Sequence, residues 1–356
     1  MTNFRKWLTI VILIAVSTHS LAAEDLDEIK NANPLSSVLR TIPNTPDHSK
    51  LNSAQLRAVK QYAKLAANAV CTTLKPGQPY KCGGFCDEFP QTTVIDRFDV
   101  DPEDIQGYIA RDDLRKAIVI SIRGTASLPN AIVDAQFKLI PYPSKLVKKA
   151  KVHEGFYKAY QGLKKVTIPA LTSQLKQYPS YDVEVVGHSL GGAMAVMQAA
   201  DIYENVPAVK KDRLYLVTVG EPRVGNDAFA KWISSAGFVS KRLVYRRDLV
   251  PHFPPRFFGY ENRGPEIHTS ARTSDTIQCK GGEDERCANG EPVLGLNALD
   301  HAVYLDVDML KCAPEHIKKT IIDLLKKMFD DFPREHVEKA NSPPSEEHAR
   351  RRRSQF

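Results

Sequence analysis

One serine of this chain lies in a short glycine-rich turn whose surroundings favour reactivity. Residues 182–186 form a β-branched run, Gly187-His188-Ser189-Leu190-Gly191-Gly192 follows, and small and apolar residues continue to Ala200. Strand, sharp turn and helix in this order are typical of a nucleophile elbow, in which small residues two positions before and after the serine avoid collisions. The amino end of the helix favours negative charge there. We therefore predict Ser189 as a nucleophile; the alternative is a helix-capping serine in an ordinary turn.

A free serine is a poor nucleophile and needs a base, which is itself oriented by an acid. In α/β-hydrolase-like enzymes the chain order is serine, acid, histidine. Asp248 follows a predicted strand at 242–245 and precedes Leu-Val-Pro. We predict Asp248 as the acid in preference to three aspartates in or beside predicted helices, Asp201, Asp212 and Asp227.

The base must come after the acid. His252 is too near Asp248 to reach back, and later histidines open a helix or lie in or near the tail, which leaves His301 and His268. His301 lies in a loop before an apolar segment and near Cys312, where a bridge would fix its position, so it is the predicted base. His153 and His188 precede the acid and are interpreted as structural.

An oxyanion needs two backbone N–H donors. The N–H of Leu190, directly after the nucleophile, is one candidate. Thr125 is the other, because it follows a predicted strand at 116–122 and Gly124 permits a tight turn.

Strands and helices alternate along the chain, which predicts a mostly parallel central sheet flanked by helices. Because sites in such sheets lie at the carboxyl ends of strands, Thr125, Ser189 and Asp248 are expected to converge. The predicted strands are 105–110, 116–122, 182–186, 213–219, 242–245 and 267–272, and the predicted helices start at 53, 152, 227 and 314.

The length of 356 residues and 42% hydrophobic residues allow one large α/β domain or two small ones. The net charge of +7 is spread along the chain, so no nucleic-acid partner is expected. Arg350–Arg353 is the one concentrated basic run, and residues 333–356 are predicted to be a disordered charged tail.

The first 23 residues are predicted to be a secretory signal peptide. Arg5 and Lys6 precede an apolar run at 7–16, and small residues end at Ala23. A secreted, extracellular and soluble protein is therefore expected; an uncleaved anchor is the alternative. Residues 24–50 are interpreted as a flexible arm or propeptide, and 314–332 as an amphipathic helix.

An even number of cysteines in a secreted chain indicates disulfides. Fifteen pairings of the six are possible. Cys82 with Cys86 and Cys279 with Cys287 are able to close small loops, which leaves Cys71 with Cys312. A metal site is disfavoured, because no Cys-x-x-Cys pair or spaced histidine accompanies them.

Four motifs together resemble the class 3, fungal-type triacylglycerol lipase family over residues 56–312. They are Ile122-Arg123-Gly124-Thr125, Val152-His153-Glu154-Gly155-Phe156, Gly187–Gly192, and Asp248-Leu249-Val250-Pro251. The resemblance implies an α/β-hydrolase domain at 51–313, the triad Ser189, Asp248 and His301, and oxyanion donors at Thr125 and Leu190. It also implies the Cys71–Cys312 and Cys82–Cys86 bridges, whereas Cys279 and Cys287 match no family bridge that we place. In the lid segment, Asn130 fits the family pattern but Ala131 stands where an aromatic residue is common.

The expected activity is hydrolysis of acylglycerols or other lipid esters through an acyl-enzyme, without metal or organic cofactor and with transient contact to a lipid interface. Phospholipase A1 or feruloyl-type esterase activity on the same triad is an alternative, and a non-catalytic lipid-binding protein is another.

Overall fold

The computed structural model describes residues 35–43, 48–101, 104–124, 137–292 and 295–331. Its centre is an eight-stranded sheet in the order β1-β2-β3-β6-β7-β9-β11-β12. The strands of this sheet are β1 Thr92–Val100, β2 Ile105–Asp112, β3 Ala117–Ile122, β6 Asp182–His188, β7 Leu214–Val219, β9 Val239–Tyr245, β11 Glu266–Thr269 and β12 Thr276–Gln278.

The five strands from β3 to β11 pair in parallel, and the outer pairings are antiparallel. The prediction of a mostly parallel sheet flanked by helices is confirmed. Strand β1 was not predicted, because polar residues such as Asp96, Arg97 and Asp99 interrupt its apolar positions. Its β-structure comes from pairing with β2.

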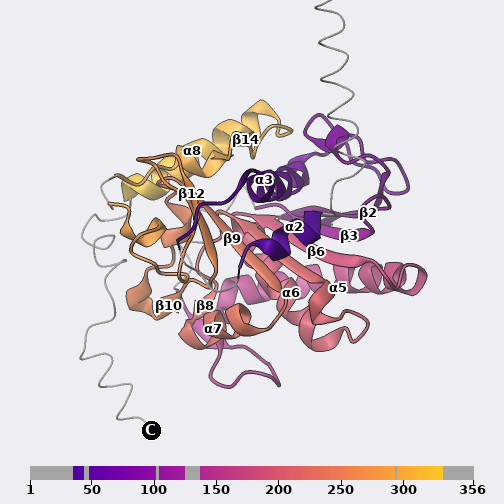
Figure 1. Ribbon diagram of the computed structural model, residues 1–356, viewed down its shortest axis with the longest axis horizontal. Helices are drawn as coiled ribbons and strands as arrows, with labels where there is room; N and C mark the ends of the chain where they lie inside the picture. Colours follow the sequence, from indigo (N-terminus) through magenta and orange to yellow (C-terminus); the bar gives the residue numbers. More distant parts are fainter. Residues whose placement is uncertain (1–34, 44–47, 102–103, 125–136, 293–294, 332–356) are drawn as a thin grey trace, which may run out of the picture.

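Both faces of the sheet are buried, and successive side chains serve two separate cores. In β3, Ile118 and Ile120 belong to one core while Val119 belongs to the other. Helices α5 Glu154–Gln177, α6 Leu190–Asn205 and α7 Asp227–Ser235 pack on the first core, and α2 Leu35–Thr41 and α3 Ser53–Ala67 on the second (Figure 1). This two-sided packing explains why the central strands are mainly apolar, and the buried charges in them, such as Glu184 and Arg242, have ion-pair partners.

The start of α3 differs in detail from the sequence prediction. Asn52, not Ser53, is the N-cap: its side chain accepts a hydrogen bond from the Gln55 amide, and the Gln55 side chain accepts one from the Asn52 amide. This reciprocal capping box satisfies two amides at the helix start.

Part of the predicted flexible arm is packed against the domain. Helix α2 buries Leu39, and the buried ammonium of Lys241 donates to the carbonyl oxygens of Ile42 and Pro43 at 2.8 and 3.3 Å. The Gln278 N–H of β12 donates to the Ser49 carbonyl oxygen at 3.0 Å. Sheet pairing and apolar burial thus hold the segment that composition alone marked as loose.

Smaller elements surround the main sheet. A four-stranded sheet has the order β10-β8-β5-β4, β13 pairs with β14, and helix α8 follows near the end of the described chain. Their bounds are β4 Leu139–Pro141, β5 Lys151–His153, β8 Gly225–Asn226, β10 Tyr260–Glu261, β13 Val303–Tyr304, β14 Val307–Asp308 and α8 Glu315–Asp331.

None of the helices in the described ranges combines the length and apolar composition needed to cross a bilayer. The predicted signal peptide, the lid segment, Thr125 and the basic tail lie outside the described residues. The predicted domain boundaries therefore stay predictions.

Candidate active site

Ser189 lies between β6 and α6 in a backbone conformation that side chains rarely adopt, with φ of 61° and ψ of −130°. A Cβ on Gly187 would lie 2.1 Å from the Gly191 carbonyl oxygen, and one on Gly191 would lie 2.1 Å from the Ile122 carbonyl oxygen. Only glycine fits these two positions. The surrounding backbone therefore holds Ser189 in a strained turn that exposes its hydroxyl at a strand end.

The amino end of α6 and the end of β3 meet beside this serine. Leu190 is the first residue of α6, so no preceding turn supplies a carbonyl for its N–H. A Cβ on Gly124 would lie 2.9 Å from the Ser189 Cβ, which shows how closely the β3 end approaches. Arg123 fixes that end, because its guanidinium donates to Gln106 and Asp104 at 2.9 and 2.8 Å.

The structure brings the predicted serine, histidine and aspartate into one hydrogen-bonded chain. The Ser189 hydroxyl donates to His301 Nε2 at 2.7 Å, and His301 Nδ1–H donates to Asp248 Oδ2 at 2.8 Å. All three side chains are buried, with exposed fractions of 4%, 2% and 0%. The arrangement allows His301 to accept the serine proton while Asp248 holds the ring in the required tautomer.

Asp248 keeps its negative charge although it is buried. Burial raises the pKa of its carboxyl, but the attraction of His301 and hydrogen bonds from His301, Tyr304 and the Val250 amide outweigh burial and hold the pKa below its usual value. The Tyr304 hydroxyl donates to Asp248 Oδ2, and the Val250 N–H donates to Oδ1 at 2.9 Å. The sequence prediction missed Tyr304; its position three residues after the base was the only available signal.

His301 lies in the short 3-10 turn Leu299–Ala302, and remote residues fix its place. Gly220, with φ of +60°, follows β7 directly, and a Cβ there would lie 2.8 Å from His301 Cε1 and 2.9 Å from the Tyr304 hydroxyl. Gly220 thus leaves the space that the base and its partner tyrosine occupy. The position of Gly220 directly after a buried strand predicts a turn, but it does not predict that this glycine leaves space for His301.

His188 connects the serine turn, residues 187–192, to the segment that carries the predicted base, residues 299–304, which we call the base segment. Its ring stacks on His301 at a centroid distance of 4.5 Å, and its Nε2–H donates to the His301 carbonyl oxygen at 2.9 Å. Burial and the neighbouring His301 lower the pKa of His188 to about 3. A neutral ring at this place adds no positive charge against a protonated His301, in agreement with the predicted structural role.

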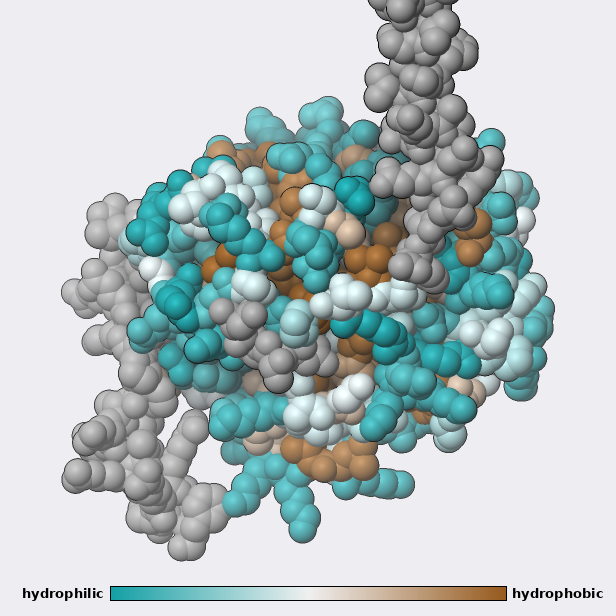
Figure 2. All heavy atoms as spheres, in the orientation of Figure 1, coloured by the Kyte–Doolittle hydropathy of each residue, from teal (hydrophilic) through white to brown (hydrophobic). Residues whose placement is uncertain are grey.

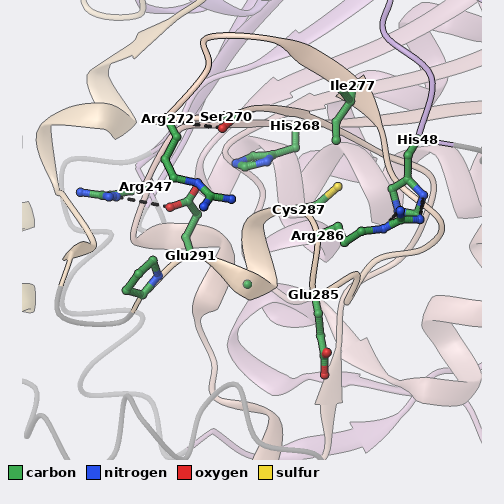
Figure 3. A pocket seen from close by; sticks show the side chains of 12 residues that line it. His48, Arg247, His268, Ser270, Arg272, Ile277, Glu285, Arg286, Cys287 and Glu291 are labelled. Carbon is green, nitrogen blue, oxygen red and sulfur yellow. Dashed lines mark hydrogen bonds and ion pairs between the residues drawn. The ribbon is translucent and has the colours of Figure 1, made fainter.

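The alternative base, His268, lies elsewhere. It lines a hollow of about 490 Å³ together with Arg247, Arg272 and Glu291 (Figure 3). Its Nε2–H donates to the Arg246 carbonyl oxygen at 3.0 Å, and its Nδ1 has no hydrogen-bond partner among the described residues. The Asp248 carboxylate is paired with His301 instead, so the geometry favours His301 over His268.

The structure contains three disulfides, with the pairings favoured from the sequence. Their Cα–Cα distances are 4.9, 5.6 and 6.2 Å for Cys71–Cys312, Cys82–Cys86 and Cys279–Cys287. In the described part of the chain, two sulfur-containing clusters have the spacing of a metal site, but every sulfur in them belongs to a disulfide. Disulfide sulfurs are not the thiolates that bind metal ions.

Comparison with known proteins decides the family. Residues 119–258 match the family model for lipase (class 3). The chain is 35% identical over 261 residues to the lipase of Rhizomucor miehei, and this alignment covers 73% of the chain and 71% of that protein. The chain belongs to the class 3 lipase family.

Other members show the same relationship. A lipase of Rhizopus niveus is 36% identical over 260 residues, which cover 73% of this class 3 chain and 66% of that protein's length. The solved lipase II from Rhizopus niveus superposes with a TM-score of 0.69 over 75% of this chain and all of that one. A solved triacylglycerol lipase with a serine protease triad as its catalytic centre is 35% identical, with a TM-score of 0.68 over 75% of this chain and 100% of that one. The α/β-hydrolase fold expected from the sequence is thereby confirmed.

Proposed function

We propose that this chain is a secreted triacylglycerol lipase that uses Ser189, His301 and Asp248 as its catalytic triad. The single observation that carries the proposal is the continuous hydrogen-bonded chain from the Ser189 hydroxyl through the His301 ring to the Asp248 carboxylate. A serine that only capped a helix would need neither a buried imidazole nor a buried carboxylate behind it.

The chemistry follows from these contacts. Ser189 Oγ attacks the ester carbonyl carbon while His301 Nε2 takes the serine proton. Asp248 stabilises the imidazolium, and the protonated ring then donates its proton to the leaving alcohol. Water, deprotonated by His301, attacks the acyl-enzyme and releases the fatty acid.

Two backbone amides are proposed to stabilise the tetrahedral oxyanion. The Leu190 N–H at the start of α6 is one donor. Thr125 N–H is the other, supported by the close approach of the preceding Gly124 to Ser189. The start of α6 fixes the Leu190 donor before reaction, so this contribution needs no reorganisation.

An apolar surface beside the base supports a lipid ester as substrate. Leu299 and Val303 flank His301 on both sides in sequence and are 48% and 39% exposed. Relatives bear names in keeping with acylglycerols and with secretion, such as a secreted mono- and diacylglycerol lipase of Fusarium solani that is 32% identical over 67% of this chain and 72% of that protein. The predicted signal peptide and the three disulfides agree with an extracellular location.

The test is hydrolysis of emulsified triolein and of a soluble short-chain ester by the secreted protein. Ser189→Ala should lower both rates on the order of 10³-fold or more. Ser235→Ala, an exposed serine on α7, is the matched control and should keep wild-type rates. Activity on the soluble ester alone would replace the lipase proposal with an esterase.

A panel of substrates separates the remaining alternatives. Diolein, monoolein, phosphatidylcholine and a feruloyl ester report the glyceride, phospholipase A1 and feruloyl esterase activities. Failure of Ser189 to react with a fluorophosphonate probe in the folded protein, with no ester hydrolysed, would leave the non-catalytic lipid-binding protein.

A further inference from the structure

A loop rich in lysine projects from the small sheet between β4 and β5. This lysine loop, residues 142–150, contains Lys145, Lys148 and Lys149, and Lys151 follows as the first residue of β5; all four lysines are exposed, and the loop has no acidic residue. Leu146 lies among them with 57% of its surface exposed, the largest fraction among the large hydrophobic residues that the structure describes as exposed. The loop hangs below α7 in Figure 1, and Figure 2 shows there a hydrophobic patch with hydrophilic side chains projecting around it.

The loop is held in shape by contacts beneath its tip. The Ser144 hydroxyl donates to the Glu204 carboxylate of α6, and the amides of Leu146 and Val147 donate to the Ser144 hydroxyl oxygen at 3.0 and 3.1 Å. Tyr142 N–H donates to the Ala150 carbonyl oxygen at 2.9 Å and closes the base of the loop. The exposure of Leu146 is therefore set by the fold.

Packing of Tyr142 anchors the loop to the protein body. Its buried ring makes edge-to-face contacts with Phe229 at 5.2 Å and Tyr157 at 6.3 Å between centroids. Exposing an apolar side chain to water in this way costs free energy, and burial against a partner surface would remove that cost.

Nearby carboxylates offset only part of the charge of the loop. Glu154 forms ion pairs with Lys138 and Lys158, both at 3.2 Å. Glu204 lies under the tip, where the neutral Ser144 hydroxyl donates to it, and its single negative charge is outnumbered by the lysines. The tip thus presents a cluster of positive charge around an apolar centre.

We propose that the lysine loop docks on an anionic lipid surface, with Leu146 entering the interface and the lysines contacting acidic headgroups. Apolar burial together with basic side chains near the headgroups is the combination that binds proteins to such surfaces. The inference rests on the proposed function in one respect: a lipase releases fatty acids, whose carboxylates make its substrate surface more negative as hydrolysis proceeds. The loop would hold the enzyme on that product-rich surface.

The exposed leucine distinguishes a lipid from other polyanions. A nucleic acid or an acidic polysaccharide would be attracted by the lysines alone, and Leu146 would contribute nothing. On a lipid surface, transfer of this side chain out of water adds a contribution that salt does not screen.

The experiment measures co-sedimentation of the full chain carrying Ser189→Ala, so that lipid is not consumed. The vesicles are phosphatidylcholine alone and phosphatidylcholine mixed with phosphatidylglycerol. We expect preferential binding to the anionic vesicles, weakened about fivefold for each lysine charge removed in the Lys145→Gln, Lys148→Gln double variant. Leu146→Ser should weaken binding about tenfold at both low and high salt.

Matched controls come from exposed residues elsewhere on the chain. The double variant Lys75→Gln, Lys81→Gln removes two exposed lysines, and Leu114→Ser removes a leucine that is 46% exposed. Both controls should bind like the parent. Equal binding to the two vesicle types, or an equal loss in the controls, would overturn the proposal. Loss on lysine replacement with no effect of Leu146→Ser would also overturn it, in favour of a general polyanion surface.

Soluble-ester hydrolysis by the loop variants with Ser189 intact separates this proposal from the proposed function. The loop variants should hydrolyse a soluble short-chain ester at wild-type rates. A chain without any esterase activity that still binds anionic vesicles through the loop would defeat the proposed function alone. An active esterase whose loop variants bind normally would defeat the docking proposal alone.

Discussion

The serine turn and the base segment of this member of the class 3 lipase family contribute neighbouring atoms to one site, but they are built in opposite ways. Ser189 is positioned by consecutive residues, with Gly187 and Gly191 removing side chains where backbone approaches. His301 is positioned from a distance, by Asp248, Gly220 and the bridge of Cys71 to Cys312. The serine turn depends on backbone geometry, whereas the base segment depends on side-chain hydrogen bonds. Substitutions in the serine turn should therefore lower stability as well as activity, and substitutions in the base segment should lower activity in a protein that still folds.

The largest effect is expected from Gly191→Ala. The new Cβ would lie 2.1 Å from the Ile122 carbonyl oxygen, and a strand backbone in a packed sheet is unable to yield as a side chain does. We expect a loss of about 3 kcal/mol or more in the free energy of unfolding, together with loss of esterase activity. Thermal unfolding and soluble-ester hydrolysis check this. Gly83→Ala, where a Cβ meets nothing within 4 Å, should change neither measurement.

Asp248→Asn should separate chemistry from folding in the base segment. The amide has nearly the same shape, but it no longer stabilises a protonated His301 or enforces the required tautomer. We expect kcat to fall on the order of 10³- to 10⁴-fold in a folded protein. Asp201→Asn, which also alters a buried carboxylate, should leave kcat within a few-fold, although it weakens contacts to Tyr160 and Lys164. Equal loss of activity in both variants would contradict the assigned role.

Tyr304→Phe removes one hydrogen bond to Asp248 and should have a smaller effect. A hydrogen bond to a charged group contributes about 1.5–3 kcal/mol, so a fall in kcat of about tenfold is expected. Because the Tyr304 hydroxyl helps to lower the pKa of Asp248, its loss should raise that pKa. A carboxylate without this hydrogen bond attracts the protonated form of His301 more strongly, so the acidic limb of the pH–rate profile should move to higher pH.

The matched control is Tyr260→Phe, since the buried Tyr260 hydroxyl has no hydrogen-bond partner among the described residues. It should leave the pH–rate profile in place. An unchanged acidic limb in Tyr304→Phe would show that Tyr304 only fills space.

The smallest effect concerns His188, which links the two regions. Its pKa is about 3 in the folded protein and about 6.5 when unfolded, so below pH 6.5 the unfolded chain binds more protons. Stability should therefore fall as the pH drops from 6.5 toward 3, by about 1.4 kcal/mol per pH unit from this residue. Gln at position 188 retains an N–H donor for the His301 carbonyl but does not titrate.

Urea unfolding at pH 7 and pH 5 measures this difference. Between these values the wild type should lose about 2 kcal/mol more than His188→Gln. Parallel losses would mean that His188 does not carry the acid sensitivity of the connection between serine turn and base segment.

Several parts of the fold were readable from the sequence because they have strong local patterns. The parallel strands β3, β6 and β7 are mainly apolar runs, and α5, α6 and α7 follow turns with small or capping residues. Strand β1 and the packed arm carry no such pattern. Strand β1 depends on pairing with the next strand, β2, and the packed arm offers carbonyl acceptors to Lys241, which is 199 residues away in the sequence.

In the site, the order of residues narrowed the base to two histidines. The structure distinguishes the two by their contacts. The His301 ring hydrogen-bonds Ser189 and Asp248, whereas the His268 ring hydrogen-bonds the Arg246 carbonyl oxygen and lines a polar hollow. Spacing along the chain contains no information on which loop folds back over a given strand end.

By itself, the sequence determined the serine turn, because a strained turn between strand and helix needs glycine at fixed short spacings. It also determined the sheet class, because buried parallel strands must be apolar on both faces. The tertiary structure alone decided that Tyr304 hydrogen-bonds Asp248, that Gly220 makes room for His301 and that Leu146 is held outward among lysines. These features arise where residues distant in sequence meet. Such contacts leave no periodic pattern in the local sequence, so only the folded structure shows them.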